Sequence, residues 1–351
     1  DAYYAEGDVE YAGRYLFSGY MTDTPLTYQS DETAAKADFT ITQEFTRENI
    51  ELKTVYTNAY SNDDILNLNV KTDAATGNVM TPNVADVHRV RIGYTKVSDA
   101  GTFEIKLNDG TTIAAAAVND SNYQPGDDEA AFNAATGEIL LGENVYKQLY
   151  ASDGFSFTYR KDNFAKGDLN PVMYYDCVDN NPDNAGVVYT KKTEDIEYNI
   201  NFSQKLKVNT EVNEVFNMYL GRDIDDLITS VNNVIDIEAQ LEKVEGMLKQ
   251  DIYSDKDSQS KLNSIKEGLT KQNELAKEEM KNRFEYCVGT MQGYQEQASL
   301  AKADAGNRMT RLNLTKSRLT EQKTNFTNLK SENEDIDLEE VVVGYSAAQL
   351  V

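Results

Sequence analysis

The chain has 351 residues, enough for two or three domains, because single domains usually run to about 100 to 200 residues. Its 34 Lys and Arg stand against 59 Asp and Glu, a formal net charge of -25, so neither nucleic acid nor a membrane surface is expected as a partner. Hydrophobic residues make up 40% of the chain, and 22 Tyr and 12 Phe supply large apolar side chains, which excludes a disordered polymer.

The first 20 residues are rich in tyrosine. These tyrosines are Tyr3, Tyr4, Tyr11, Tyr15 and Tyr20. Such a cluster can form a sugar-binding face, or it can pack against long helices. We favour packing, because it requires no ligand.

Residues 29–208 carry apolar side chains at every second position, which is typical of half-buried strands. The alternating runs are Phe39 and Ile41; Leu66, Leu68 and Val70; Val90, Ile92 and Tyr94; Phe103, Ile105 and Leu107; Phe155, Phe157 and Tyr159; and Ile196, Tyr198, Ile200 and Phe202. Asn108, Asp109 and Gly110 follow one run, and Asp-Gly favours a tight hairpin turn. We predict mostly antiparallel β structure with almost no helix.

After Asn209 the chain contains no proline, and apolar residues recur at spacings of three and four. One amphipathic segment extends from residue 224 to 248, and a longer heptad seam extends from residue 280 to 329. We predict antiparallel helices over residues 223–248 and 258–333, joined by a charged turn at residues 251–257. The side chains expected to face inward are Phe284, Met291, Leu312, Leu319 and Phe326, and the seam also contains Cys287, Ala298, Ala301 and Ala305.

Catalytic chemistry has little basis in the sequence. His88 is the single histidine, which excludes a two-histidine zinc motif, and we interpret it as a surface or strand-end side chain. No phosphate-binding glycine loop, dinucleotide glycine pattern or Gly-x-Ser-x-Gly elbow occurs. Cys287 lies on the heptad seam, where a buried small hydrophobe explains it better than a reactive thiolate, and Cys177 has no assigned role. We predict no enzyme activity, no catalytic residue and no cofactor.

One acidic loop deserves comparison with calcium sites. Asp179, Asn181 and Asp183 alternate as the first ligands of a calcium loop do. The expected glycine is Asn184, however, and the position of the bidentate glutamate is Thr190. We therefore favour an ordinary polar turn and predict no metal site.

Three segments carry a resemblance to a known family. Residues 13–25 read Gly-Arg-Tyr-Leu-Phe-Ser-Gly-Tyr-Met-Thr-Asp-Thr-Pro, residues 305–312 read Ala-Gly-Asn-Arg-Met-Thr-Arg-Leu and continue to residues 333–341, and residues 200–216 lead back into the helical half. The second and third segments resemble the C-terminal helix and the return into the rod in the flagellin family of bacterial flagella. The first resembles the stretch that distinguishes hook-filament junction proteins within that family.

The resemblance implies an α+β fold, in which a long antiparallel helical rod, the flagellin-like core domain, carries an inserted, mostly antiparallel β outer domain. The rod domain would comprise residues 1–28 and 209–335, and the outer β domain residues 29–208. Residues 336–351 would begin the C-terminal core helix, with Asp337 as its N-cap and Glu340 three residues later. Longer helical regions flank these segments in the family, so we expect a fragment without both terminal helical segments.

The function implied is that of a structural subunit of the bacterial flagellum that joins hook to filament. It would be exported by the flagellar secretion machine and lie outside the cell. Its partners would be flagellin, a hook-side junction protein and an export chaperone, with self-association of the full-length protein. Two alternatives remain open: a flagellin filament subunit, which residues 13–25 argue against, and a surface adhesin or glycan-binding module that uses the tyrosine-rich β half.

Overall fold

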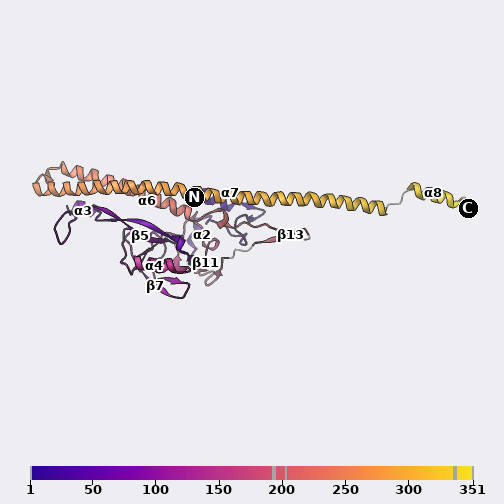
Figure 1. The fold of residues 1–351 in the computed structure, drawn as a ribbon, viewed down its shortest axis with the longest axis horizontal. Coiled ribbons are helices and arrows are strands. Elements are labelled where there is room, and N and C mark those ends of the chain that lie inside the picture. Colours follow the sequence, from indigo (N-terminus) through magenta and orange to yellow (C-terminus); the bar gives the residue numbers. More distant parts are fainter. Residues whose placement is uncertain (1, 192–194, 202–203, 335–337, 350–351) are drawn as a thin grey trace. The chain divides into compact units, whose positions relative to one another are not determined.

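The computed structural model describes residues 2–191, 195–201, 204–334 and 338–349. It is a mixed α+β structure with a long helix and a large, mostly antiparallel sheet, as predicted (Figure 1). The chain separates into two compact units. The first comprises Asp1–Thr193 and Thr210–Ala298, and the second comprises Glu194–Asn209 and Ser299–Val351.

The first unit contains a sheet of ten strands in the order β12-β11-β3-β10-β6-β7-β8-β9-β5-β4. The pair β7 and β8 is parallel, and the other neighbours are antiparallel. The strands are β3 (Phe39–Phe45), β4 (Ile50–Thr57), β5 (Asn83–Arg91), β6 (Phe103–Leu107), β7 (Thr112–Ala117), β8 (Ala130–Asn133), β9 (Glu138–Leu141), β10 (Phe155–Lys161), β11 (Asp176–Asp179) and β12 (Val188–Tyr189).

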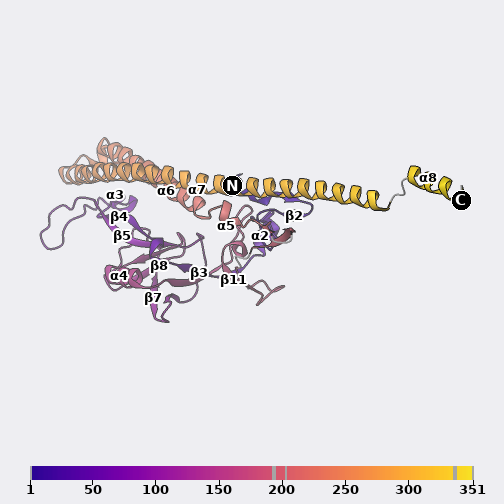
Figure 2. The same cartoon turned by 45° about the vertical axis from the view of Figure 1, so that its right-hand side comes forward.

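The alternating sequence pattern places one face of this sheet in an apolar core. In β10, Phe155, Phe157 and Tyr159 are buried while the residues between them are more exposed. Helix α4 (Glu143–Ala151) packs on the same core through Val145 and Leu149 (Figure 2). The predicted hairpin at Asp109-Gly110 is confirmed, because β6 and β7 pair on either side of it and Gly110 has a φ of 91°.

The first 28 residues share this core. They form α1 (Ala2–Ala5), the 3-10 turn η1 (Glu6–Asp8) and a two-stranded hairpin of β1 (Glu10–Tyr11) and β2 (Arg14–Tyr15). Leu26, which is 1% exposed, lies in the core. Asp8 fixes this segment by accepting hydrogen bonds from the backbone N–H of Leu26 (2.7 Å) and the hydroxyl of Thr27 (2.5 Å).

Two long helices form a second core in the first unit. Helix α6 (Tyr219–Leu248) leads through the short turn η4 (Asp251–Tyr253) into α7 (Lys256–Glu334), which confirms the predicted helices and the turn between them. Ion pairs from Lys266 to Glu245 (2.8 Å) and from Lys277 to Glu238 (2.7 Å) show that they are antiparallel. Buried residues at heptad spacing hold the pair together. They are Val234, Ile237, Val244 and Met247 in α6 and Leu262, Ile265, Leu269 and Ala276 in α7.

Two predictions about the β half are wrong in detail. Residues 66–70 do not form a strand: Ser61 caps the short helix α3 (Asn62–Leu66) in a capping box with Asp64, and Leu68 takes a φ of 51°. Almost no helix was expected in this half, yet α4 is a helix of nine residues, and α2 (Asp31–Ala35) and α3 add one turn each.

The second unit contains the hairpin of β13 (Glu197–Asn201) and β14 (Gln204–Lys207), the C-terminal part of α7, and α8 (Leu338–Gln349). Asn209 links its elements, because its side chain accepts a hydrogen bond from the backbone N–H of Ile196 (2.8 Å) and its carbonyl accepts one from Arg308 (2.7 Å). The predicted N-cap Asp337 lies outside the described residues. No helix in the described part of the chain is long and apolar enough to cross a membrane.

Candidate functional site

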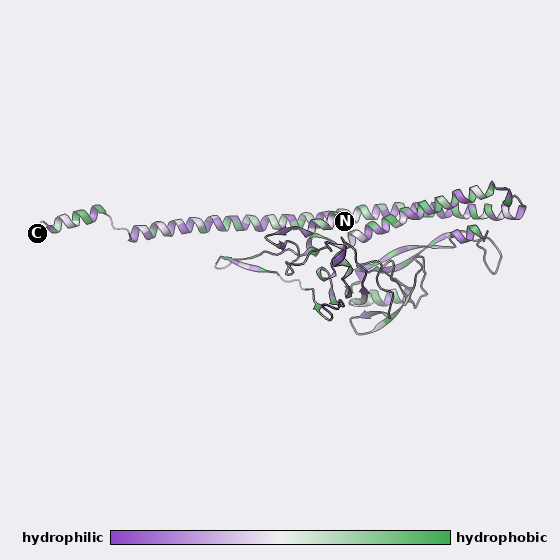
Figure 3. Ribbon diagram, turned by 180° about the vertical axis from the view of Figure 1, so that it is seen from behind, coloured by the Kyte–Doolittle hydropathy of each residue, from purple (hydrophilic) through white to green (hydrophobic). Residues whose placement is uncertain are grey.

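The heptad seam of α7 divides into two rows of residues that differ in exposure. The covered row is Met280, Cys287, Tyr294, Ala301, Arg308 and Thr315, which are buried or half-buried. The exposed heptad row is Phe284, Met291, Ala298, Ala305, Leu312, Leu319 and Phe326, each seven residues after the last. All of its members are exposed except Ala298, which is half-buried. In the hydropathy colouring, apolar residues recur among hydrophilic ones along this helix (Figure 3).

The prediction that the large side chains of this row face inward is wrong. In the first unit Phe284 is 45% exposed and Met291 37%, and in the second unit Leu312, Leu319 and Phe326 are 39%, 45% and 71% exposed. The pattern alone indicated an apolar face, but it did not show whether this chain covers that face. A row of apolar side chains at strict heptad spacing is the surface that another helix packs against in a coiled coil.

Polar contacts turn a different side of α7 toward the rest of the first unit. Tyr294 donates a hydrogen bond to the carboxylate of Asp223 (2.8 Å), and Gln297 donates one to the carbonyl of Asn213 (2.5 Å). Cys287, which is 3% exposed, lies seven residues before Tyr294 on the same helix and is the predicted buried hydrophobe. These contacts fix the rotation of α7 about its axis, so Phe284 and Met291 remain at the surface.

Buried charges join the sheet to α6. Arg89 of β5 is 2% exposed and pairs with Glu138 of β9 (2.5 Å) and Asp226 of α6 (2.5 Å). Glu138 also pairs with Lys53 of β4 (2.6 Å). Burial opposes ionisation of Glu138, but Lys53 and Arg89 more than offset it and lower the pKa of this carboxyl to about 2. The carboxylate is therefore ionised at neutral pH.

Arg91, two residues along the same strand, repeats this arrangement. Its guanidinium pairs with Asp223 of α6 (2.8 Å) and with Glu51 of β4 (2.7 Å). Because Asp223 also accepts from Tyr294 of α7, one carboxylate connects the sheet to both long helices. A weak signal for this cluster is present in the sequence. Charged residues interrupt the apolar alternation of β5, and Asp223 and Asp226 lie three positions apart near the start of α6.

The structure places His88 against α4. Its ring stacks on Tyr146 with centroids 3.5 Å apart, and its Nε2 lies 3.7 Å from the carboxylate of Glu143. Burial lowers the pKa of His88, although Glu143 and Asp86 act in the opposite direction. The sequence favoured a surface or strand-end side chain, but His88 lies within β5 and is half-buried against α4.

The other candidates from the sequence are Cys177 and the acidic loop of Asp179, Asn181 and Asp183. Cys177 is a free thiol on β11, and burial raises its pKa to about 12, which makes it a poor nucleophile. In the acidic loop, Asp179 accepts a hydrogen bond from the backbone N–H of Asn181 (2.9 Å), whose side chain accepts from that of Asp183 (3.0 Å). The oxygens thus stabilise a polar turn, and the described residues include no cluster of three or more side chains that could hold a metal ion.

The tyrosines near the start of the chain divide into two groups. Tyr4 is 8% exposed, and its hydroxyl donates to the carbonyl of Asn217 (2.8 Å) and accepts from the N–H of Gly221 (3.1 Å), so it packs against the start of α6. Tyr11 and Tyr20, by contrast, are 76% and 48% exposed. The packing interpretation therefore holds for Tyr4 and not for these two.

Comparisons of the chain with protein-family models, with curated proteins and with solved structures give no match.

Proposed function

We propose that the protein is a structural subunit of the bacterial flagellum that joins the hook to the filament. The observation that carries this proposal is the exposed heptad row of α7. Helical subunits of a tubular assembly must present apolar surface to neighbouring helices, and this row repeats every seven residues over seven positions.

The energy available from such a surface is substantial. Covering a few hundred Å² of apolar side chain is worth several kcal/mol at about 25 cal/mol per Å². The covered row gains less from apolar burial, because Tyr294 and Arg308 make polar contacts and the buried Thr315 carries a hydroxyl group. The exposed row therefore has the stronger tendency to bind another helix.

The resemblance of residues 13–25 to junction proteins supports the position between hook and filament. The proposal includes flagellin and a hook-side junction protein as partners, an export chaperone, self-association of the full-length protein, and a location outside the cell. It also holds that the protein works by packing and not by catalysis.

Deletion of the gene in the bacterium that carries it tests this proposal. We expect hooks without filaments in electron micrographs and flagellin released into the medium. Normal filaments and motility would refute the proposal. Loss of flagellin itself, with junction proteins still present on the hooks, would instead favour the alternative of a filament subunit.

Variants of the same gene test the role of the exposed heptad row. Leu319→Glu places a charge in the row and is expected to reproduce the filament-less hooks. Ser317→Glu is the matched control, because Ser317 is exposed on the same helix but lies on a different face. Equal filament attachment in both variants would exclude the row as the assembly surface, whatever the result of the deletion.

A further inference from the structure

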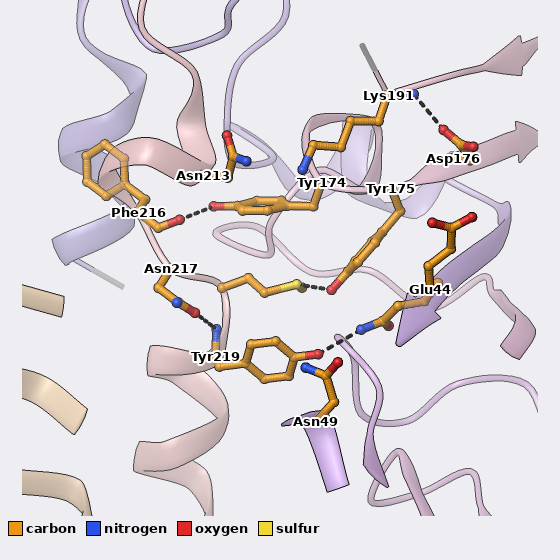
Figure 4. A pocket seen from close by; sticks show the side chains of 12 residues that line it. Glu44, Asn49, Tyr174, Tyr175, Asp176, Lys191, Asn213, Phe216, Asn217 and Tyr219 are labelled. Carbon is orange, nitrogen blue, oxygen red and sulfur yellow. Dashed lines mark hydrogen bonds between the residues drawn. The ribbon is translucent and has the colours of Figure 1, made fainter. Parts of the chain in front are cut away.

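The first unit contains a pocket of about 450 Å³ that the sequence did not indicate. It lies where β3, β11 and the start of α6 come together. Its walls include Tyr174, Tyr175 and Tyr219, and its polar residues include Glu44, Asn49, Asp176, Lys191, Asn213 and Asn217 (Figure 4). This volume is within the range of about 300 to 1,000 Å³ that is usual for small-molecule sites.

The aromatic walls are held in place by their own hydrogen bonds. The hydroxyl of Tyr174 donates to the carbonyl of Phe216 (3.1 Å). The hydroxyl of Tyr219 accepts from the amide of Gln43 (2.8 Å) and donates to the carbonyl of Arg91 (3.3 Å). These rings do not need to reorganise when a ligand enters, which lowers the entropic cost of binding.

Several polar groups of the pocket have no partner. In the part of the chain that the structure describes, no hydrogen bond or ion pair engages the ammonium of Lys191, the carboxylate of Glu44 or the side-chain amide of Asn213. Figure 4 shows the side chains of Lys191 and Asn213 projecting into the pocket. Lys191 is half-buried, and burial lowers its pKa against the opposing charges of Glu211 and Asp176. Lys191 and Asn213 are half-buried, whereas Glu44 is exposed. A ligand that bonds to Lys191 and Asn213 would supply partners that these two half-buried groups otherwise lack.

The chemistry of the lining selects among ligand classes. A phosphate or another strong anion is disfavoured, because Glu44 and Asp176 outnumber the single cation Lys191. A wholly apolar ligand would leave the ammonium and the carboxylates without partners. A neutral sugar has hydroxyl groups that both donate and accept, which match the donor Lys191, the acceptor Glu44 and the amide of Asn213. Its C–H faces suit the flat tyrosine rings.

We infer that this pocket binds a neutral saccharide, with Lys191, Glu44 and Asn213 bonding to adjacent hydroxyl groups beside the three tyrosine rings. The site lies within the first unit and does not involve the exposed heptad row. Saccharide binding and assembly are therefore separate properties of the chain.

Saturation-transfer NMR and titration calorimetry on the whole chain test the inference. The probes are the neutral sugars glucose, galactose, mannose and N-acetylglucosamine and their β-linked disaccharides, with the acidic sugars glucuronate and sialic acid as a second set. We expect at least one neutral probe to bind and the acidic probes to bind at least tenfold more weakly. Binding of acidic probes alone, or of no probe in either set, would overturn the inference.

Three variants locate the binding site. Lys191→Ala and Asn213→Ala are each expected to weaken binding of the neutral probe by roughly tenfold, as expected for loss of a hydrogen bond to a charged or amide group. Lys166→Ala, which removes an exposed lysine outside the pocket, should leave binding unchanged. Far-ultraviolet circular dichroism verifies that each variant is folded, and unchanged binding in both folded pocket variants would place any saccharide elsewhere.

Discussion

Replacing Glu138 by Gln is expected to destabilise the first unit by about 3 kcal/mol at pH 7. The pKa of this carboxyl falls from its ordinary value of 4.5 to about 2 in the folded chain, although burial alone would raise it. A difference of about 2.5 pH units corresponds to roughly 3 kcal/mol at about 1.4 kcal/mol per unit. The substitution keeps the size of the side chain but leaves Lys53 and Arg89 facing a neutral amide, and losing one partner of a buried ion pair typically costs about 3–5 kcal/mol.

Urea unfolding followed by tyrosine circular dichroism measures this loss, since the chain has no tryptophan. Glu104→Gln is the matched control, because Glu104 lies on β6 of the same sheet and is exposed. It should change the free energy of unfolding by less than about 0.5 kcal/mol. Equal stability of the Glu138→Gln variant and the natural chain at pH 7 would refute the buried ion cluster as a source of stability.

The same contribution should depend on pH in one direction. A carboxyl whose pKa is lowered by folding stabilises the protein above its unfolded pKa, here about 4.5, and this stabilisation is lost as the pH falls toward 2. The gap between the natural chain and the Glu138→Gln variant should therefore narrow progressively between pH 5 and pH 2. A gap of constant size over that interval would contradict the assignment of the low pKa to this residue.

Two further pairs of substitutions, each with its own control, test packing and backbone conformation. Leu262→Ala removes a side chain that is 0% exposed between α6 and α7, and it should lower the free energy of unfolding in urea by about 2–5 kcal/mol. Its control, Leu314→Ala, changes a position that is 66% exposed and should lower this free energy by less than about 0.5 kcal/mol. Gly137→Ala should destabilise the chain more than Gly77→Ala: both glycines have positive φ angles (64° and 69°), but a Cβ at Gly137 would collide with the carbonyl of Tyr94 while Gly77 has open space around it. Equal thermal midpoints for the two glycine variants would show that the backbone near Gly137 can shift to admit the methyl group.

Elements with long repeating patterns were predictable from the sequence. In β3 and in β10, buried and more exposed residues alternate over seven positions, because one face of the sheet is buried. The run at residues 66–70 has three apolar positions, as many as the run at residues 155–159, but the capping box of Ser61 and Asp64 starts a helix that extends to Leu66. Local side-chain to backbone hydrogen bonds therefore decided the structure at a place where the apolar pattern alone favoured a strand.

The candidate sites were harder to predict, because they depend on which distant segments meet. The heptad seam of α7 was recognised, but its covered side is set by hydrogen bonds such as that from Tyr294 to Asp223, whose residues are 71 positions apart. The pocket collects residues from segments between Gln43 and Tyr219. Neither its tyrosines nor Lys191 stand in a local motif, so no single stretch of sequence pointed to it.

Both edges of the ten-stranded sheet are poorly suited to pairing with another chain. At one end, β12 is only two residues long. At the other, β4 shares a groove with α7, lined by Glu51 and Thr54 on the strand and by Glu279 and Arg283 on the helix. Short edge strands, and edges with charged side chains and a neighbouring helix, discourage the strand-to-strand aggregation that open sheet edges permit. Many copies held at high local concentration are thus not expected to pair through the edges of this sheet.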